Sequence, residues 1–376
     1  MGKLGADAVR KKVAFLVNGP GELWGWARPL GTEMARRRWV VDVHLLACPF
    51  ASGMERRAAR HFSWTRAVVG PCQPLKSIVA LGHGRYDLFV QLGGDLLFGR
   101  IASALNRSPL ACYAYGPKRG LNRCDLSATA FPNMASTMTP STLSLGDLVS
   151  DGLTLDLKAP TPWLPGGRRL LILPGSRPAI REAVRAYVGR TVRALRPRRD
   201  LQVVSLLPPF VDDQEKRLWL RSGVRPFSGG TRAALAGADL AVTQPGTNTL
   251  ELMHAGIPSL VVVPFEFLRR IPLSGLKGWL LSFPGGVALK ESLLRRAAGR
   301  RGYLAWPNRL ASQEIMPELV GDVSPVDLAH RIDVLLDDQR WLNWQRRTLQ
   351  AMSDASAPSP SSRLCDELER LVGIRT

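Results

Sequence analysis

Short runs of apolar residues alternate with amphipathic segments along most of the chain. Such runs, when bounded by glycine or proline, are typical of buried parallel strands, and a period near 3.6 is typical of the helices between them. The predicted strands are Val13–Val17, Val40–Leu46, Ala67–Val69, Leu88–Leu92, Leu110–Tyr113, Leu170–Leu173, Leu201–Leu206, Leu240–Val242 and Ser259–Val263. The predicted helices are Ala27–Arg38, Gly53–His61, Ala179–Leu195, Asp212–Ser222 and Thr247–Ala255. The alternation predicts an α/β fold of two doubly wound, Rossmann-like halves.

A segment rich in proline and glycine, residues 158–167, separates the two series of strands and cannot continue a helix or a strand. We therefore predict an N-terminal domain over residues 1–160 and a C-terminal domain over residues 168–350. Residues 351–376 then form a small-residue hinge, Ser353–Ser362, and a last helix, Arg363–Val372. The hinge allows this helix either to cross back to the N-terminal domain or to exchange with a second copy of the chain in a homodimer.

Composition narrows the class of protein. The net charge of +20 predicts an anionic partner, namely nucleic acid, a membrane surface or a phosphorylated substrate, although arginine-rich helix ends explain the same excess without a function. No run of about 18 apolar residues occurs, so we expect no transmembrane helix. The five cysteines and five histidines lack disulfide or metal spacing, which predicts a reducing cytoplasm, no bound metal and no cofactor.

Two loops that follow strands in the first half carry candidate chemistry, because ligands bind at the carboxyl ends of doubly wound strands. In the first loop, Asn18, Gly19 and Gly21 allow a ligand close to the backbone, and Glu22 either orients a sugar hydroxyl or stabilises the helix start. The second loop ends at Asp95, which is either the base that takes a proton from an acceptor hydroxyl or the N-cap of the next helix. Glu22 is the alternative base.

Two loops in the second half are suited to a diphosphate. After the strand that ends at Leu173, the backbone donors of Gly175 and Ser176 and the guanidinium of Arg177 form a natural clamp for phosphate oxygens. A later loop bends at a Pro-Gly pair and opens a helix whose free N–H groups suit a donor's phosphates. Its candidate ligands are Gln244, Gly246, Thr247, Asn248 and Glu251, the last of these for ribose hydroxyls.

Downstream, Asn308 either hydrogen-bonds a uracil edge or a sugar group or caps a helix. Three motifs together resemble the lipid-A-disaccharide synthase family: Leu-Pro-Gly-Ser-Arg at 173–177, Pro-Gly-Thr-Asn-Thr-Leu-Glu at 245–251 before Gly-Ile-Pro at 256–258, and Pro-Asn-x-Leu-Ala at 307–311 before Pro-Glu-Leu at 317–319.

That resemblance implies a GT-B fold, whose two domains face a central cleft, and the transfer of a diacylglucosamine from UDP to a lipid sugar phosphate. It places Arg177, Asn308, Glu314 and residues 244–251 in the active site and Asp95 on the family's catalytic aspartate. Three segments depart from the family pattern, residues 18–22, 115–119 and 151–153. All three lie in the acceptor half, which indicates a relative that acts on another lipid or polyprenyl acceptor.

Residues 265–301 mix arginines and lysines with Trp279, Phe283 and other apolar side chains. They are either a contact with an anionic membrane surface or an ordinary amphipathic surface pair of helices. No recognised nucleic-acid motif accompanies them, so we expect no nucleic-acid partner. The sequence therefore predicts a cytoplasmic enzyme, peripheral on the inner face of the cell membrane.

The predicted reaction is an inverting transfer of a sugar from a UDP-sugar donor to a lipid-linked acceptor. Two other functions fit the same pattern. One is a UDP-GlcNAc 2-epimerase-like enzyme, which needs carboxylates and histidines around the sugar. The other is a non-catalytic relative that binds only nucleotide or membrane.

Overall fold

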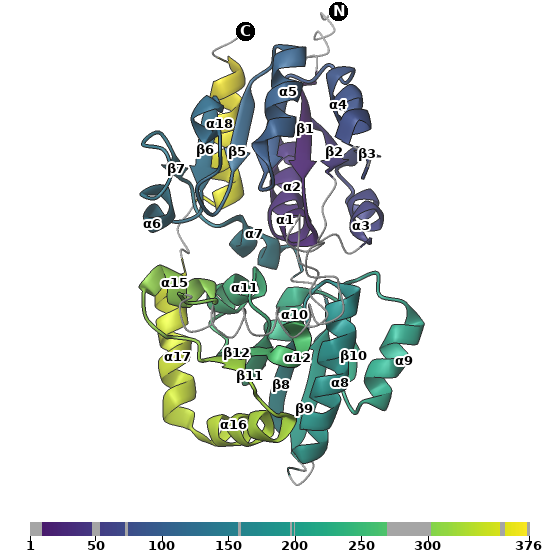
Figure 1. Cartoon of the computed structure of the whole chain (residues 1–376), viewed down its shortest axis with the longest axis vertical. Helices are drawn as coiled ribbons and strands as arrows, with labels where there is room; N and C mark the ends of the chain where they lie inside the picture. Colours follow the sequence, from purple (N-terminus) through teal and green to yellow (C-terminus); the bar gives the residue numbers. More distant parts are fainter. Residues whose placement is uncertain are drawn as a thin grey trace, which may run out of the picture. The chain divides into compact units, whose positions relative to one another are not determined.

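The computed structural model describes residues 10–46, 53–71, 74–156, 159–195, 198, 200–268, 302–353 and 358–373. The chain divides into two compact units, each built on one parallel sheet (Figure 1). The first unit is Met1–Gly152 together with Ser356–Thr376, and the second is Leu153–Ala355.

The first unit contains a seven-stranded sheet in the order β3-β2-β1-β4-β5-β6-β7, with every pair parallel. Strand β1 lies inside this sheet and is covered on both faces, so its residues form an apolar run, and Val13 through Leu16 are fully buried. The strands are β1 (Lys12–Val17), β2 (Val40–Leu45), β3 (Thr65–Val69), β4 (Leu88–Leu92), β5 (Leu110–Tyr113), β6 (Leu126–Thr129) and β7 (Leu143–Ser144).

The helices of the first unit include the last helix of the chain. They are α1 (Pro20–Glu22), the π-helical turn η1 (Leu23–Ala27), α2 (Arg28–Arg36), α3 (Glu55–His61), α4 (Pro74–Gly82), α5 (Leu96–Asn106), the 3₁₀ turn η2 (Leu121–Arg123), α6 (Pro132–Ala135), α7 (Leu148–Thr154) and α18 (Pro360–Gly373). Helix α18, yellow in Figure 1, packs on α2. The Arg37 guanidinium, just after α2, lies 2.6 Å from Oδ1 of Asp366 and 2.9 Å from Oε2 of Glu369. The chain's end thus completes the first unit.

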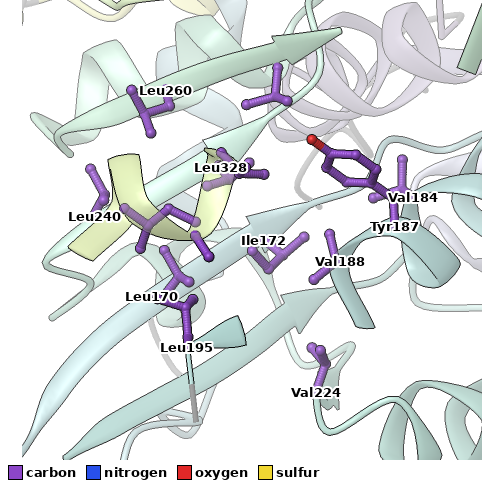
Figure 2. Close-up of a cluster of buried hydrophobic side chains, with 14 of the residues drawn as sticks. Leu170, Ile172, Val184, Tyr187, Val188, Leu195, Val224, Leu240, Leu260 and Leu328 are labelled. Atoms are coloured by element: carbon purple, nitrogen blue, oxygen red, sulfur yellow. The ribbon is translucent and has the colours of Figure 1, made fainter. Parts of the chain in front are cut away.

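The second unit contains a six-stranded parallel sheet in the order β10-β9-β8-β11-β12-β13. Leucine and isoleucine side chains of β8 meet side chains of α8 and Leu328 of α16 in its core (Figure 2). The strands are β8 (Arg168–Leu173), β9 (Leu201–Leu206), β10 (Arg225–Phe227), β11 (Leu240–Thr243), β12 (Ser259–Pro264) and β13 (Glu318–Gly321). The helices are α8 (Pro178–Ala194), α9 (Asp213–Arg221), α10 (Thr231–Leu235), α11 (Asn248–Ala255), α12 (Phe265–Leu268), α15 (Trp306–Ala311), α16 (Pro325–Asp337) and α17 (Gln339–Met352).

Every strand predicted from the sequence is present, with ends shifted by at most two residues. The prediction missed β6, β7, β10 and β13, which have four residues or fewer, and it gave no bounds for helices α4, α5, α16 and α17. The predicted interdomain linker differs from the structure. The units divide at Gly152, and Trp163 is buried in the second unit, where its indole Nε1 donates to the carbonyl of Ala234 at 2.9 Å.

A network of hydrogen bonds connects polar side chains around β2 of the first sheet. The Asp42 carboxylate, 2 % exposed, accepts from Nε of Arg66 at 2.8 Å and from the Tyr86 hydroxyl at 2.8 Å. The Tyr86 oxygen lies 2.8 Å from Nε2 of His44. Because Tyr86 donates to Asp42, His44 is assigned as the donor, with a proton on Nε2 and none on Nδ1, for which the described residues supply no partner. Burial lowers the pKa of His44 to about 4.

This lowered pKa makes the stability of the first unit depend on pH. In the unfolded chain His44 binds a proton near pH 6.5, whereas the folded chain resists protonation until about pH 4. Stability is therefore lost as the pH falls from 6.5 to 4, and we expect about 2 kcal/mol of loss from this group between pH 7 and pH 4.5. His44→Gln keeps a donor toward Tyr86 and removes the titration. In urea unfolding at both pH values, the variant should lose about 2 kcal/mol less than the wild type; equal losses would contradict this assignment.

Candidate functional sites

The first sheet brings its two candidate loops together. Strand β1 lies beside β4, with Val17 opposite Leu92, and the strand order reverses here because β2 lies on the other side of β1. Such a reversal leaves a crevice at the carboxyl ends of the strands. The loop that begins at Asn18 and the loop that begins at Gly93 therefore start side by side.

Side chains of the first loop cover the glycines of the second. A Cβ atom at Gly93 would lie 3.2 Å from Cγ of Glu22, and one at Gly94 would lie 3.0 Å from Cβ of Asn18. Glu22 also lies over its own loop, where a Cβ atom at Gly19 would come within 2.7 Å of its Oε2. Gly93 and Gly94 have φ of +69° and +66°, which favours glycine. Asn18 and Glu22 thus meet both loops, and both are partly exposed, as is Gly21.

Asp95 is the N-cap of α5. Its Oδ1 accepts from the backbone N–H of Leu97 at 2.9 Å, and the residue is exposed. The structure therefore realises the capping alternative for Asp95. Its assignment as the catalytic base stays a prediction.

The sequence prediction gave no role to three side chains that continue this edge. Tyr115, in the loop after β5, accepts from the indole Nε1 of Trp26 at 2.9 Å and donates to Asp147, which is 1 % exposed. Burial raises the pKa of the Tyr115 hydroxyl well above its usual range, so it stays a donor. An aromatic residue just after a predicted strand was the one available signal.

The second sheet shows the same reversal between β8 and β11. Leu173 lies opposite Thr243, so the loops at 174–177 and 244–247 leave neighbouring strands at the same level. Gly175 has φ +85° and Gly246 has φ +138°, and apart from its chain neighbours no described heavy atom lies within 4 Å of a Cβ atom at either position. These two glycines therefore border open space, unlike those of the first sheet.

Helices start directly after both open loops. Within the described chain, neither Arg177, the N-cap of α8, nor Thr247, the N-cap of α11, caps its helix with a side-chain hydrogen bond. First-turn N–H groups and the helix dipole favour an anion at such ends. Ser176, Arg177 and Asn248 are partly exposed there.

Internal hydrogen bonds fix the turn before α11. Gln244 donates from Nε2 to the carbonyl of Val262 at 2.7 Å, and the Thr249 hydroxyl donates to the carbonyl of Gly246 at 2.8 Å. Glu251, one turn into α11, is 9 % exposed. Gln244 is thus a scaffold of the turn in this structure, while ligand contacts by Thr247, Asn248 and Glu251 stay predictions.

Internal hydrogen bonds occupy the Asn308 side chain, and its assignment to a uracil edge or a sugar group stays a prediction. The side chain is fully buried. Its Nδ2 donates to the carbonyl of Met316 at 2.7 Å and to Oε1 of Glu318 at 2.9 Å, and its Oδ1 accepts from the N–H groups of Ile315 and Met316, each at 2.8 Å. Every hydrogen-bonding position of the amide is therefore used. Exposed Glu314 accepts from the N–H of Glu318 at 3.2 Å, and its active-site role stays a prediction.

Metal and membrane features are limited in the part of the chain that the structure describes. Within that part, no cluster of three or more histidine, cysteine or carboxylate side chains is arranged to hold a metal ion. None of its helices combines the length and the apolar character needed to cross a bilayer. The sequence predicts a membrane contact at residues 265–301, and of these, residues 269–301 lie outside the described part of the chain.

Asn308→Ala should act on stability and not on nucleotide affinity. The change leaves two N–H groups and a carbonyl without their partner, and we expect a loss of about 2–4 kcal/mol. Thermal unfolding measures this loss, and UDP titration of the folded variant should match the wild type. Glu314→Ala, at an exposed position of the same segment, is the stability control. It should change the free energy of unfolding by less than about 0.5 kcal/mol. A selective loss of UDP affinity in the Asn308 variant would support the ligand-binding assignment.

No family model matches the chain. A UDP-N-acetylglucosamine–N-acetylmuramyl-(pentapeptide) pyrophosphoryl-undecaprenol N-acetylglucosamine transferase of Sorangium cellulosum is 33% identical over 233 residues, which cover 57% of this chain and 54% of that protein. A lipid-A-disaccharide synthase of Klebsiella pneumoniae is 29% identical over 198 residues, which cover 49% and 44%. The chain spans about half the length of the curated relatives it matches.

Solved structures match over nearly the whole chain. Acinetobacter baumannii MurG aligns with a TM-score of 0.58 and 15% identity, over 96% of this chain and 99% of that one. S. aureus MnaA in complex with UDP aligns with a TM-score of 0.64 and 13% identity, over 96% and 97%. A Neisseria meningitidis UDP-GlcNAc 2-epimerase bound to UDP-GlcNAc gives 0.57 and 11%, over 96% and 100%. The two Rossmann-like units thus form a GT-B type of fold, and the sequence relatives are glycosyltransferases.

Proposed function

We propose that the chain is a glycosyltransferase that moves a sugar from a UDP-sugar to a lipid-linked sugar acceptor. One observation carries the proposal: the adjacent loops at Gly175 and Gly246 border open space, and each is followed by a helix start. A nucleoside diphosphate is an anion that such paired helix starts suit. The names of the relatives support the same class, since one is an N-acetylglucosamine transferase named for UDP-N-acetylglucosamine and another is a lipid-A-disaccharide synthase.

The donor diphosphate would lie against Gly175–Arg177 and Gly246–Asn248. The acceptor hydroxyl oxygen attacks the anomeric carbon, the bond from that carbon to the β-phosphate oxygen breaks, and UDP leaves with the electron pair. Arg177 stabilises the charge that develops on the leaving diphosphate. A single displacement of this kind inverts the anomeric centre.

A carboxylate of the first unit takes the proton of the acceptor hydroxyl. Of the two candidates, Glu22 lies beside the glycines of both loops, whereas Asp95 accepts the hydrogen bond that caps α5. We therefore assign the base to Glu22 and the helix cap to Asp95. Formation of a lipid A disaccharide is the finer proposal, supported by the motif resemblance and by the synthase relatives. Such an acceptor, with the net charge of +20, also suits a peripheral enzyme on the inner face of the cell membrane.

A methyl group at Gly175 tests the nucleotide site. Gly175→Ala places it in the proposed diphosphate position, and we expect UDP affinity to fall at least about tenfold, or 1.4 kcal/mol, by isothermal titration calorimetry. Gly166→Ala is the matched control, because Gly166 has φ +76° against +85° at Gly175, and both positions border open space. Both variants pay a similar backbone strain, and only the first should lose affinity. Equal affinities would place the diphosphate elsewhere.

An epimerase remains the second candidate, because a UDP-GlcNAc 2-epimerase has the same fold. The five histidines argue against it, since none lies in the four loops at the strand ends. His44 is in β2, and His330 is exposed on α16. His61 hydrogen-bonds the carbonyl of Arg57 in α3, and His83, just after α4, hydrogen-bonds the carbonyl of Val79. His254 hydrogen-bonds the Ser353 hydroxyl.

Turnover with and without acceptor separates the two candidates. With UDP-GlcNAc alone we expect no epimerised product by NMR, and with added membrane lipid extract a sugar-bearing lipid detected by mass spectrometry. Arg177→Ala should lower this rate by about 100-fold. Glu22→Gln should lower it by about 100-fold or more, and Asp95→Asn much less. Turnover of the UDP-sugar to an epimer without acceptor would favour the epimerase.

A further inference from the structure

We propose that Arg181 is a positioning residue, which holds the loop at 174–177 in the conformation that binds the diphosphate; this inference rests on the proposed function. Arg181 lies in the first turns of α8 and is 3 % exposed. Its Nε and Nη2 each donate to the Glu215 carboxylate at 2.8 Å, and its Nη1 donates to the backbone carbonyl of Ser176. All three nitrogens of the guanidinium are therefore used, two on a carboxylate and one on the loop.

The bond to Ser176 fixes the direction of the next amide. In a trans peptide the C=O of one residue and the N–H of the following residue point in opposite directions. Because the Ser176 carbonyl is turned toward buried Arg181, the N–H of Arg177 is turned away from it. Gly175, two residues before Arg177, borders open space, and the diphosphate of the proposed function lies on that side of the loop. The proline after Arg177 keeps that residue extended, with ψ 125°, so the loop cannot merge into the helix.

Glu215 is itself held in place. It lies in the first turn of α9, where its N–H donates to Oδ1 of the N-cap Asp212 at 2.7 Å, and the fully buried Trp219 directs its Nε1 toward Oε1 of Glu215 at 3.5 Å. Glu215 is 34 residues from Arg181 in the chain, so the pair joins two helices to one loop. Burying the Arg181 guanidinium beside the partly exposed Glu215 carboxylate costs desolvation that an apolar side chain would avoid, and a fixed geometry is one reason to retain such a group.

A second arginine of the same unit offers a matched control. Arg198, after α8, lies 2.7 Å from Oδ1 of Asp333 and also pairs with Asp337. It joins the segment after α8 to α16, again through charged hydrogen bonds, and in the described part of the chain none of its ion-pair partners lies in either open loop. Loss of Arg198 therefore tests what removal of a tertiary ion pair does by itself.

The experiment compares Arg181→Lys, Arg181→Met and Arg198→Gln. Lysine keeps the charge near Glu215 but cannot supply three directed donors, so it retains folding better than methionine does. Calorimetry measures the affinity for UDP. NMR titration measures the affinity for uridine, which has the same base and ribose and lacks the phosphates. We expect Arg181→Lys to lower the affinity for UDP at least tenfold and the affinity for uridine by less than twofold. Arg198→Gln should lower the thermal stability and change neither affinity by more than twofold.

Amide hydrogen exchange supplies a readout that does not depend on nucleotide. In Arg181→Lys, exchange in the 174–182 peptide should accelerate, while exchange in β8 and β11 stays as in the wild type. Unchanged exchange in that peptide, or equal losses of UDP and uridine affinity, would overturn the positioning role. Absence of UDP binding by the wild type, with exchange accelerated in the variant, would instead overturn the proposed function and leave the loop support standing.

Discussion

The reversal of strand order within each parallel sheet is the constraint on which the candidate sites depend. Where the first strand of a doubly wound sheet has neighbours on both sides, the connections leave toward opposite faces of the sheet. A crevice then forms between the loops that follow the two neighbouring strands. In the first unit this brings together the loops at Asn18 and Gly93, and in the second unit those at Pro174 and Gln244. The four strand-end motifs of the sequence therefore form two pairs, although the members of each pair are about 70 residues apart.

The two pairs use the same topology differently. In the first unit, Glu22 and Asn18 cover the glycines of the partner loop, so functional groups come from side chains. In the second unit, Gly175 and Gly246 border open space, and the nearest donors are backbone N–H groups at two helix starts. Side chains such as Glu22 suit proton transfer, whereas fixed N–H groups suit a spread anionic charge. This contrast is the physical reason to place the acceptor hydroxyl on the first unit and the diphosphate on the second.

Most of the strands could be predicted from local pattern, because strands buried on both faces are continuous apolar runs, as Val13–Val17 and Leu170–Leu173 are. Strands β10 and β13 were not predicted because their short sequences, Arg-Pro-Phe and Glu-Leu-Val-Gly, lack a continuous apolar run, and their pairing depends on the neighbouring strands. The loop motifs were found because glycine and proline mark turns by local conformation. The motif at Asn308 does not distinguish a ligand-binding amide from one that satisfies buried backbone groups, and only the fold shows the internal hydrogen bonds.

Arg181 was missed for a related reason. An arginine in an amphipathic helix is usually a solvated side chain, and only the fold shows that Glu215 lies opposite it. Buried charge alone does not imply a functional role, however. Asp42, 2 % exposed, pairs with Arg66 and Lys12 and accepts a hydrogen bond from Tyr86 inside the core, and none of these three partners lies in a loop at the carboxyl end of a strand. What separates Arg181 is its third donor: two nitrogens neutralise a carboxylate, and the remaining one sets the orientation of a peptide beside the open loop. A charged pair that only joined two helices would not need that bond, so the geometry of the Ser176 carbonyl, and not the ion pair, is the argument for a role in binding.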